Sequence, residues 1–405
     1  MKKRTLKYLF LIAAVMFCVS SNTKVQAASD FVIKKSGQEY ILTEYKGRDT
    51  TVYVPKKVTI INGAFKNNKK IKKIVLSDKV DSIYDGSFDT LKNLKEVVFS
   101  KGLTTIEKGA FRKCPKVKSI KIPKKCKYIG DYAFAGLSGL KSIKVEKGNK
   151  FFKVYKGALF NSKKTELICY PRKYSGNKVF TVPKTVKVIA SYAFKDNCYM
   201  EKLIIKGDAY DGGYDDMKAF TNMKKLKTVV FKTTQKRDNI SFRNCKKLKK
   251  VVLAEGTEKI VDKQFYGCKN LTTINIPKSV KIIEKNAFKG CTKKISISGS
   301  SVDANAKKIK AAGAKSIKKV YTPIFATKYA TSGLVSGKAG TVAITAENVK
   351  SVTKVTASSA DEKIIKIKNE KTSGLTYSAE IFGEAAGSAK VTFKIAYKRM
   401  DGKTA

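Results

Sequence analysis

The chain has 405 residues, of which 42% are hydrophobic, enough for two or three domains with an ample core. Lys and Arg total 85 against 32 Asp and Glu, which gives a formal charge of +53, and the sequence contains no His and no Trp. The absence of His excludes Ser-His-Asp and Cys-His catalysis, and the positive charge directs attention to anionic partners.

Residues 1–27 have the features of a secretory signal peptide. A basic start (Lys2, Lys3, Arg4 and Lys7) precedes an apolar run at 8–19, and Val25-Gln26-Ala27 predicts cleavage near Ala27. A membrane anchor is the alternative, but the run is too short to span a bilayer comfortably. No later run of 18 apolar residues exists. We therefore expect a secreted or cell-surface protein with no transmembrane segment in the mature chain.

A repeated unit occupies residues 55–300. A Phe, usually preceded by Ala or Ser, recurs at intervals of 23, 23, 23, 60, 26, 22, 23 and 23 residues. These anchors are Phe65, Phe88, Phe111, Phe134, Phe194, Phe220, Phe242, Phe265 and Phe288. A fixed period of this length predicts a solenoid of about ten stacked repeats. Residues 28–54 are expected to cap its first core face.

The positions after each anchor are also periodic. Residues six, nine and eleven after the Phe are apolar in every repeat, as in Leu271, Ile274 and Ile276. Positions nine and eleven point to one side of a short strand, because side chains alternate along a strand. A single repeat cannot bury these residues alone, so stacking must supply the core, and a mostly β fold of short strands and turns is predicted.

The repeats resemble the BspA-like (type 5) leucine-rich repeats of bacterial surface proteins. The pattern L-x-x-I-x-I-P-x-x-V-x-x-I, followed by A-F-x-x-C, is close to complete at 271–291, and 118–126 (KSIKIPKKC) also matches. The resemblance covers about 52–291. It implies extracellular binding, often adhesion, and brings no catalytic residues.

Two segments interrupt the period. At 147–181 we expect a hairpin insert, with strands at 154–160 and 166–170 about the polar turn 161–164, lying on the stack without breaking it. At 207–219 an acidic stretch contains Asp208, Asp211, Asp215 and Asp216. It could be a calcium loop, but its spacing does not fit an EF-type loop, and a solvated acidic bulge is favoured.

The chain changes character after residue 300. Residues 301–319 are expected to hold a capping helix at 302–312, ending at Gly313, and a linker. Residues 320–405 are richer in Thr, Ser, Ala and Val, with strand-like alternation at 364–368 and 390–396. This part resembles a group 2 bacterial Ig-like domain, which implies a small β-sandwich.

Seven cysteines follow the expected signal peptide. Four of them (Cys114, Cys245, Cys268 and Cys291) stand three residues after an anchor Phe, where other repeats have Leu, Met or Asn. Buried thiols are the favoured interpretation, since metal-ligand spacings such as C-x-x-C are absent. Cysteines of adjacent repeats would lie about 5 Å apart, within reach of a disulfide.

Lysines recur at positions seven, eight and ten after the anchors. The lysine ladder is defined here as Lys72, Lys73, Lys95, Lys118, Lys121, Lys141, Lys144, Lys202, Lys227, Lys249 and Lys250. Positions eight and ten alternate with buried positions and should face outward. Stacked lysines about 5 Å apart repel by about 0.8 kcal/mol in water, which a bound polyanion would relieve.

These features predict a secreted or surface binding and adhesion protein whose basic surface engages a polyanion, such as a wall polymer, an acidic glycan or a host surface. A surface protein is another possible partner, whereas export argues against nucleic acid. High lysine content could instead reflect general composition. A non-catalytic structural cell-wall protein is the alternative function, and a carboxylate-based glycan-acting enzyme is the remaining one. We predict no catalytic residue, cofactor or metal site.

Overall fold

The computed structural model describes residues 26–213, 218–233, 240–299, 302–320, 324–329, 339–347, 349–360, 365–373, 375–383 and 391–400. Most of the expected signal peptide therefore lies outside the described residues. The chain divides into two compact units, Met1–Gly139 with Lys144–Lys150, and Leu140–Ile143 with Phe151–Ala405. None of the helices in the described ranges is both long and apolar enough to cross a membrane.

The first unit opens with the short 3-10 helix η1 (Ala28–Asp30) and an antiparallel hairpin of β1 (Phe31–Ser36) and β2 (Glu39–Tyr45). The hairpin is followed by β3 (Thr51–Tyr53), β4 (Ile60–Ile61), β5 (Lys73–Val75), β6 (Ser82–Ile83), β7 (Glu96–Val98), β8 (Thr105–Ile106), β9 (Ser119–Ile122) and β10 (Tyr128–Ile129). Strand β2 pairs in parallel with β4, so the hairpin continues directly into the repeats.

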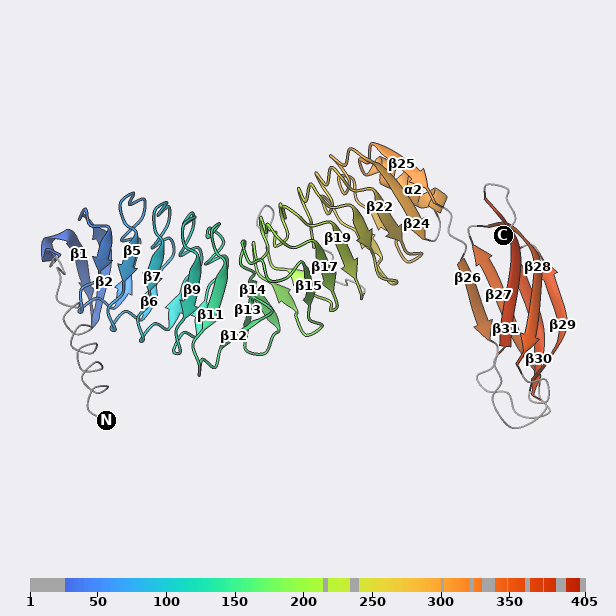
Figure 1. The fold of residues 1–405 in the computed structure, drawn as a ribbon, viewed down its shortest axis with the longest axis horizontal. Helices are drawn as coiled ribbons and strands as arrows, with labels where there is room; N and C mark the ends of the chain where they lie inside the picture. The colour runs from blue at the N-terminus through green and yellow to red at the C-terminus, as the bar shows by residue number, and fades with distance from the viewer. Residues whose placement is uncertain are drawn as a thin grey trace, which may run out of the picture. The chain divides into compact units, whose positions relative to one another are not determined.

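Each repeat of the first unit forms one coil that contributes short strands to parallel ladders. One sheet has the order β1-β2-β4-β6-β8-β10 and another has the order β3-β5-β7. The stacked strands are visible in the blue-to-green part of the chain (Figure 1). Ile74 of β5 and Ile83 of β6 are both fully buried, which confirms that the two apolar segments of each repeat build the core.

A row of aromatic rings runs through the first unit. Ring centroids are 6.0 Å apart for Tyr45 and Phe65, 5.7 Å for Phe65 and Phe88, 4.7 Å for Phe88 and Phe111, and 5.9 Å for Phe111 and Phe134. The anchor residues are buried. Aromatic pairs at these separations add to the stabilisation from burial, so the row holds successive coils together.

The second unit continues the same architecture. Strand β11 (Ser142–Val145) has residues of both units. The repeats of the second unit then contain β12 (Phe152–Tyr155), β13 (Ala158–Asn161), β14 (Glu166–Cys169), β15 (Val179–Val182), β16 (Val188–Ile189), β17 (Lys202–Ile205), β18 (Tyr210–Asp211), β19 (Thr228–Phe231), β20 (Lys250–Val252), β21 (Lys259–Ile260), β22 (Thr273–Ile276), β23 (Ile282–Ile283), β24 (Lys294–Gly299) and β25 (Ser316–Lys319). The main sheet is parallel throughout, with the order β15-β17-β19-β20-β22-β24-β25.

A second aromatic row runs through this unit. It begins at Tyr170, 5.2 Å from Phe194, and continues through Phe220, Phe242, Phe265 and Phe288 at centroid distances of 5.0, 5.1, 6.3 and 5.5 Å. The rows confirm the predicted solenoid. Tyr170 occupies an anchor position that the Phe count could not reveal.

The insert at 147–181 contains the expected antiparallel pair, formed by β13 and β14, but it differs from a simple hairpin. The run 154–160 forms two strands, β12 and β13, about Lys156 and Gly157, both of which have positive φ. Strand β14 then pairs in parallel with β16. The insert therefore contributes a coil to the stack, where we expected it to lie on top.

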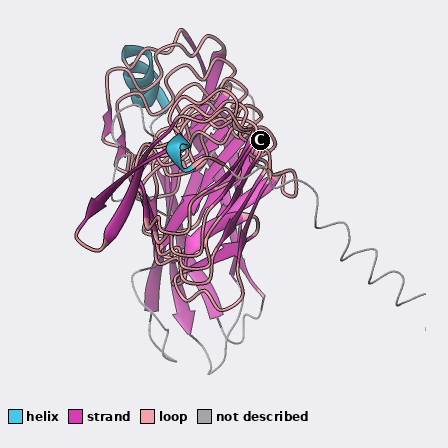
Figure 2. Cartoon of the chain, turned by 90° about the vertical axis from the view of Figure 1, so that its left-hand side faces the viewer, coloured by secondary structure: helices cyan, strands magenta, loops and turns pink. Residues whose placement is uncertain are grey.

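The last coil of the solenoid contains the helix α2 (Val302–Ala311), whose Val302, Ala306 and Ile309 are buried, and β25, which forms a strand where we expected a linker. Gly313 follows with φ of 97°, a conformation that suits glycine after a helix. The amide of Phe288 donates a hydrogen bond to the carbonyl of Ala312 at 3.0 Å, so the segment after the helix covers the last anchor. In Figure 2, α2 is the larger cyan segment among strands drawn in magenta.

The C-terminal residues form a small β domain. Its strands are β26 (Ile324–Tyr329), β27 (Ala339–Glu347), β28 (Val349–Ser359), β29 (Ile365–Ser373), β30 (Thr376–Gly383) and β31 (Val391–Arg399). They form one sheet of order β26-β27-β30-β29 and a second antiparallel pair, β28-β31. Tyr377 of the first sheet and Phe393 of the second meet edge to face at 6.0 Å, so the two sheets share a core. Its Ig-like character stays a prediction.

Candidate functional site

The lysine ladder of the first unit follows the coil spacing. Lys72 and Lys95 are exposed on consecutive coils, and the amide of Lys95 donates to the carbonyl of Lys72 at 2.8 Å. Lys118 is exposed at the same position of the next coil. Backbone hydrogen bonding thus fixes the base of these side chains, while their amino groups extend into solvent.

The second unit repeats this column with one additional lysine. Successive amide-to-carbonyl hydrogen bonds of 2.7, 2.7, 2.8 and 3.0 Å join Lys178, Glu201, Lys227, Lys249 and Thr272. Lys178 is exposed but was missed by counting from the anchors, because the insert hides its coil. The hydrogen bonds between coils identify it as a further member of the column.

Lysines at positions eight and ten after the anchors form less continuous columns than we expected. In the main sheet of the second unit, Lys202 pairs with Thr228, which in turn pairs with Lys250, so a threonine separates the two lysines. The outward positions ten after the anchor are mostly Val or Ile, such as Ile204 and Val230. Lys121 and Lys144 occupy this position in other coils and are exposed. Position seven therefore carries most of the ordered charge.

Three ladder lysines form ion pairs. Lys73 lies 3.0 Å from Glu96, Lys121 lies 2.6 Å from Glu146, and Lys227 lies 2.7 Å from Glu201. The hydrogen bond from Lys227, together with nearby cations, lowers the pKa of Glu201. The bond from Lys121 likewise lowers the pKa of Glu146. These glutamates neutralise the three lysines that they contact. Most ladder lysines have no ion-pair partner among the described residues.

The other eight ladder lysines take part in no ion pair with any residue in the described part of the chain. They are Lys72, Lys95, Lys118, Lys141, Lys144, Lys202, Lys249 and Lys250, and all are exposed. Solvated ammonium groups at coil spacing can contact a flexible anionic chain without first breaking internal pairs. The arrangement suits charge-based binding.

The repeats match the model of a known protein family. The model for the BspA type leucine rich repeat region matches residues 58–175, 169–296 and 215–324, well over half of the sequence. The chain belongs to the BspA-type leucine-rich repeat family. No curated protein matches this member.

Several solved structures resemble this BspA-type chain. A leucine rich cell surface protein from Faecalibacterium prausnitzii has 20% identity and a TM-score of 0.46, covering 72% of this chain and 99% of its own. A leucine-rich repeat protein from Eubacterium ventriosum has 22% identity and a TM-score of 0.43, covering 64% and 77%. The pneumococcal vaccine antigen PcpA has 18% identity and a TM-score of 0.39, covering 72% and 97%.

The acidic stretch of the BspA-type repeats does not fit the favoured interpretation of a solvated bulge. Asp211 is 1% exposed and lies in β18, where it pairs with Ile189 and occupies the core position of that isoleucine. Its carboxylate accepts hydrogen bonds from the amides of Gly213 and Ala219 at 3.0 Å. These two backbone donors thus satisfy a buried carboxylate. Asp215 and Asp216 lie outside the described residues.

The cysteines of the repeats are free thiols. Cys114, Cys245, Cys268 and Cys291 are buried, and each Sγ donates to the carbonyl of the anchor Phe of the preceding coil. Asn197, at the same position, donates its amide to Pro171 at 3.3 Å. Cys and Asn in this column can therefore both donate a hydrogen bond to the preceding coil, whereas Leu91, Leu137 and Met223 fill the same position by apolar packing alone.

A second basic cluster was missed by the sequence reasoning. It consists of Arg243, Lys263 and Lys289, and it lines a cleft together with Tyr266 and two asparagines. Arg243 and Lys289 directly follow anchors, and Lys263 lies two residues before one. Aligning these two positions across the repeats would have shown the cluster, because the first unit has three glycines and Tyr132 at the positions equivalent to Lys263.

Proposed function

We propose that this chain is an exported, non-catalytic binding protein that adheres to an anionic polymer through the lysine ladder. The observation that supports this most is the set of eight exposed ladder lysines that have no ion-pair partner among the described residues. Stacking holds their backbones in register, so a polymer with regularly spaced anions can meet several of them at once. Membership of the BspA-type family supports a surface binding role.

The signal-peptide features place the proposed partner outside the cell. Wall polymers, acidic glycans and host surface components all present repeated carboxylate, phosphate or sulfate groups. Binding to such a chain releases its counterions, so affinity should fall steeply as salt increases. A structural cell-wall protein held by charge alone would share this dependence, but it would bind the producing cell's own polymer and no host glycan.

The test is binding of the mature chain to purified wall polymer and to heparin across a salt series. The proposal expects the logarithm of the binding constant to fall linearly with the logarithm of salt concentration. An affinity that stays flat from low to physiological salt would overturn it. Binding to wall polymer alone would favour the structural role over adhesion.

A further inference from the structure

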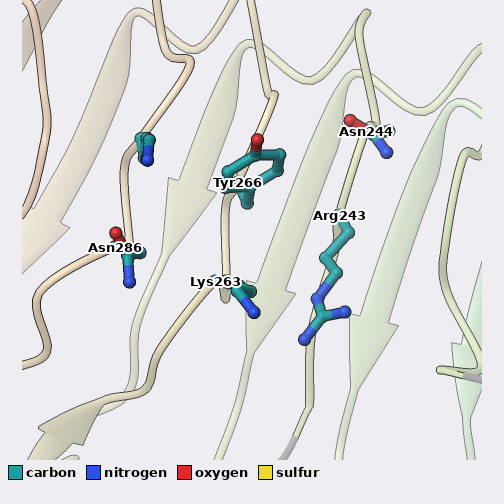
Figure 3. A pocket seen from close by; sticks show the side chains of 6 residues that line it. Arg243, Asn244, Lys263, Tyr266 and Asn286 are labelled. Carbon is teal, nitrogen blue, oxygen red and sulfur yellow. The ribbon is translucent and has the colours of Figure 1, made fainter. Parts of the chain in front are cut away.

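A cleft of about 340 Å³ crosses three consecutive coils of the second unit. It is lined by Arg243, Asn244, Lys263, Tyr266, Asn286 and Lys289. Tyr266 and Lys263 lie on the central coil, with Arg243 and Asn244 on one side and Asn286 on the other (Figure 3). The volume is near the lower end for small-ligand sites, which are about 300–1,000 Å³, so the cleft suits one small ligand or one unit of a polymer.

Close stacking of the coils produces this row of side chains. The amide of Asn244 donates to the carbonyl of Tyr266 at 2.7 Å, and the amide of Gly267 donates to the carbonyl of Lys289 at 2.9 Å. A Cβ on Gly267 would lie only 2.3 Å from the Oδ1 of Asn244. The glycine therefore allows the close approach that brings Arg243, Tyr266 and Lys289 to successive positions of one row.

The carboxylate of Asp262 contacts two of the residues that line the cleft. Asp262 accepts a hydrogen bond from the Nδ2 of Asn286 at 3.0 Å and lies 3.8 Å from the Nζ of Lys263. Ser241 also donates its hydroxyl to the carbonyl of Lys263 at 3.1 Å. Three cations therefore line the cleft, and Asp262 offsets part of their charge.

The corresponding positions of the first unit are different. There the residue after the anchor is Asp89 in one coil and Arg112 in the next, and the two form an ion pair at 2.9 Å. At these two coils the charges after the anchors therefore neutralise each other. The residue two before the anchor is Gly63, Gly86, Gly109 or Tyr132, so none of the four is a cation. The cleft at 243–289 is thus a local construction and is not a general consequence of the repeat.

We propose that this cleft binds an acidic sugar unit, independently of the lysine ladder. Its chemistry fits each part of such a ligand. Arg243, Lys263 and Lys289 can hold a carboxylate, with Arg suited to bidentate contact. The amides of Asn244 and Asn286 both donate and accept, as hydroxyl groups require. Tyr266 supplies an apolar ring face with a polar edge, against which a sugar ring can pack.

The test uses the full mature chain and three probes: glucuronate, glucose and inorganic phosphate, titrated by NMR or calorimetry. We expect glucuronate to bind about tenfold or more tightly than glucose, because a charge-assisted hydrogen bond is lost with the neutral sugar. Arg243→Gln and, separately, Lys289→Gln should weaken glucuronate binding by several-fold or more. Tyr266→Leu should weaken both sugars.

The matched control is Arg112→Gln, which removes the same charge at the same repeat position in the first unit and should leave glucuronate binding unchanged. A double change of Lys72 and Lys95 to Ser should also leave it unchanged, which separates this cleft from the ladder. The proposal is wrong if glucuronate shows no saturable binding, or if Arg112→Gln costs as much as Arg243→Gln. If phosphate binds as well as glucuronate and Tyr266→Leu has no effect, the cleft is an anion site and the sugar assignment fails.

Discussion

The Sγ of Cys268 donates a hydrogen bond to the carbonyl oxygen of Phe242 at 3.2 Å, across the interface between two coils. Cys245 and Cys291 make the same contact with Phe220 and Phe265. The carbonyl of Phe242 also accepts from the amide of Cys245 at 3.2 Å, so the thiol adds a second hydrogen bond to it, this one between coils. Burial also raises the pKa of Cys245 and of Cys291 from about 9 to about 12.

The first prediction concerns these thiols. In the folded protein at pH 8, a thiol reagent should modify only Cys198 quickly, because Cys198 is half-buried whereas the other six cysteines of the described chain are buried. The remaining thiols should react at the rate of unfolding. Urea should expose them all, and rapid modification of Cys268 without urea would contradict the structure.

The same pKa shifts predict how stability depends on pH. An unfolded thiol ionises near pH 9, whereas Cys245 and Cys291 stay protonated until about pH 12, so the unfolded state binds fewer protons between these values. Stability should therefore be retained below pH 9 and fall as pH rises toward 12. Urea midpoints measured from pH 8 to 11 test this. Replacing Cys245, Cys268 and Cys291 by Ala should flatten the decline, whereas Cys198→Ser should not.

The second prediction concerns the aromatic row. Phe265 is fully buried between Phe242 and Phe288, so Phe265→Ala should lower the free energy of unfolding by about 3–5 kcal/mol. Ile282, which is 54% exposed, provides the control, and Ile282→Ala should cost less than about 1 kcal/mol. Urea unfolding followed by circular dichroism compares the two. Equal losses would show that the ring is not a core residue.

The fold was predictable from the sequence wherever the period was intact. Phe65, Phe111, Phe242 and Phe288 mark their coils because only a large apolar residue fills that position. Tyr170 and Lys178 were not found, because the insert shifts the count from one anchor to the next. At Asp211 a polar residue took a core position, which residue type alone argues against.

The candidate site was predictable only in part. The exposure of the ladder lysines follows from the alternation of side chains on a strand. The pairs that Lys73, Lys121 and Lys227 make with glutamates depend on which residue faces them on the next coil. The cleft around Tyr266 combines residues from three coils, so no single repeat contains its pattern.

The third prediction concerns Asp211. Asp211→Ala would leave the buried amides of Gly213 and Ala219 without this acceptor, and should cost about 1–3 kcal/mol. Millimolar Ca²⁺ should not shift the melting temperature of the wild-type chain, since these carboxylate oxygens already accept from backbone donors. Thermal melts with Ca²⁺ and with chelator decide between the interpretations. Stabilisation by Ca²⁺ that disappears in the variant would support a calcium loop.

The fourth prediction compares two glycines with positive φ. At Gly37, with φ of 59°, an added Cβ meets no atom within 4 Å, so Gly37→Ala should cost only the conformational strain of about 1–2 kcal/mol. At Gly267, with φ of 69°, the Cβ would collide with Asn244. Gly267→Ala should therefore destabilise the protein more than Gly37→Ala, as measured by urea unfolding. Equal costs would mean that the exposed Asn244 side chain moves aside without a measurable penalty.

The most direct test of the central claim is the salt dependence of binding for two variants that lose equal charge. One replaces the ladder residues Lys72, Lys95, Lys118 and Lys141 by Ser, and the other replaces Lys57, Lys79, Lys101 and Lys125, which are exposed but lie outside the ladder. If the ladder holds the polymer, the first variant should lose affinity for it, and its salt slope should fall by up to about one for each lysine that contacts an anion, while the second stays close to wild type. Equal losses in both variants would mean that overall charge, and no ordered ladder, is responsible for binding.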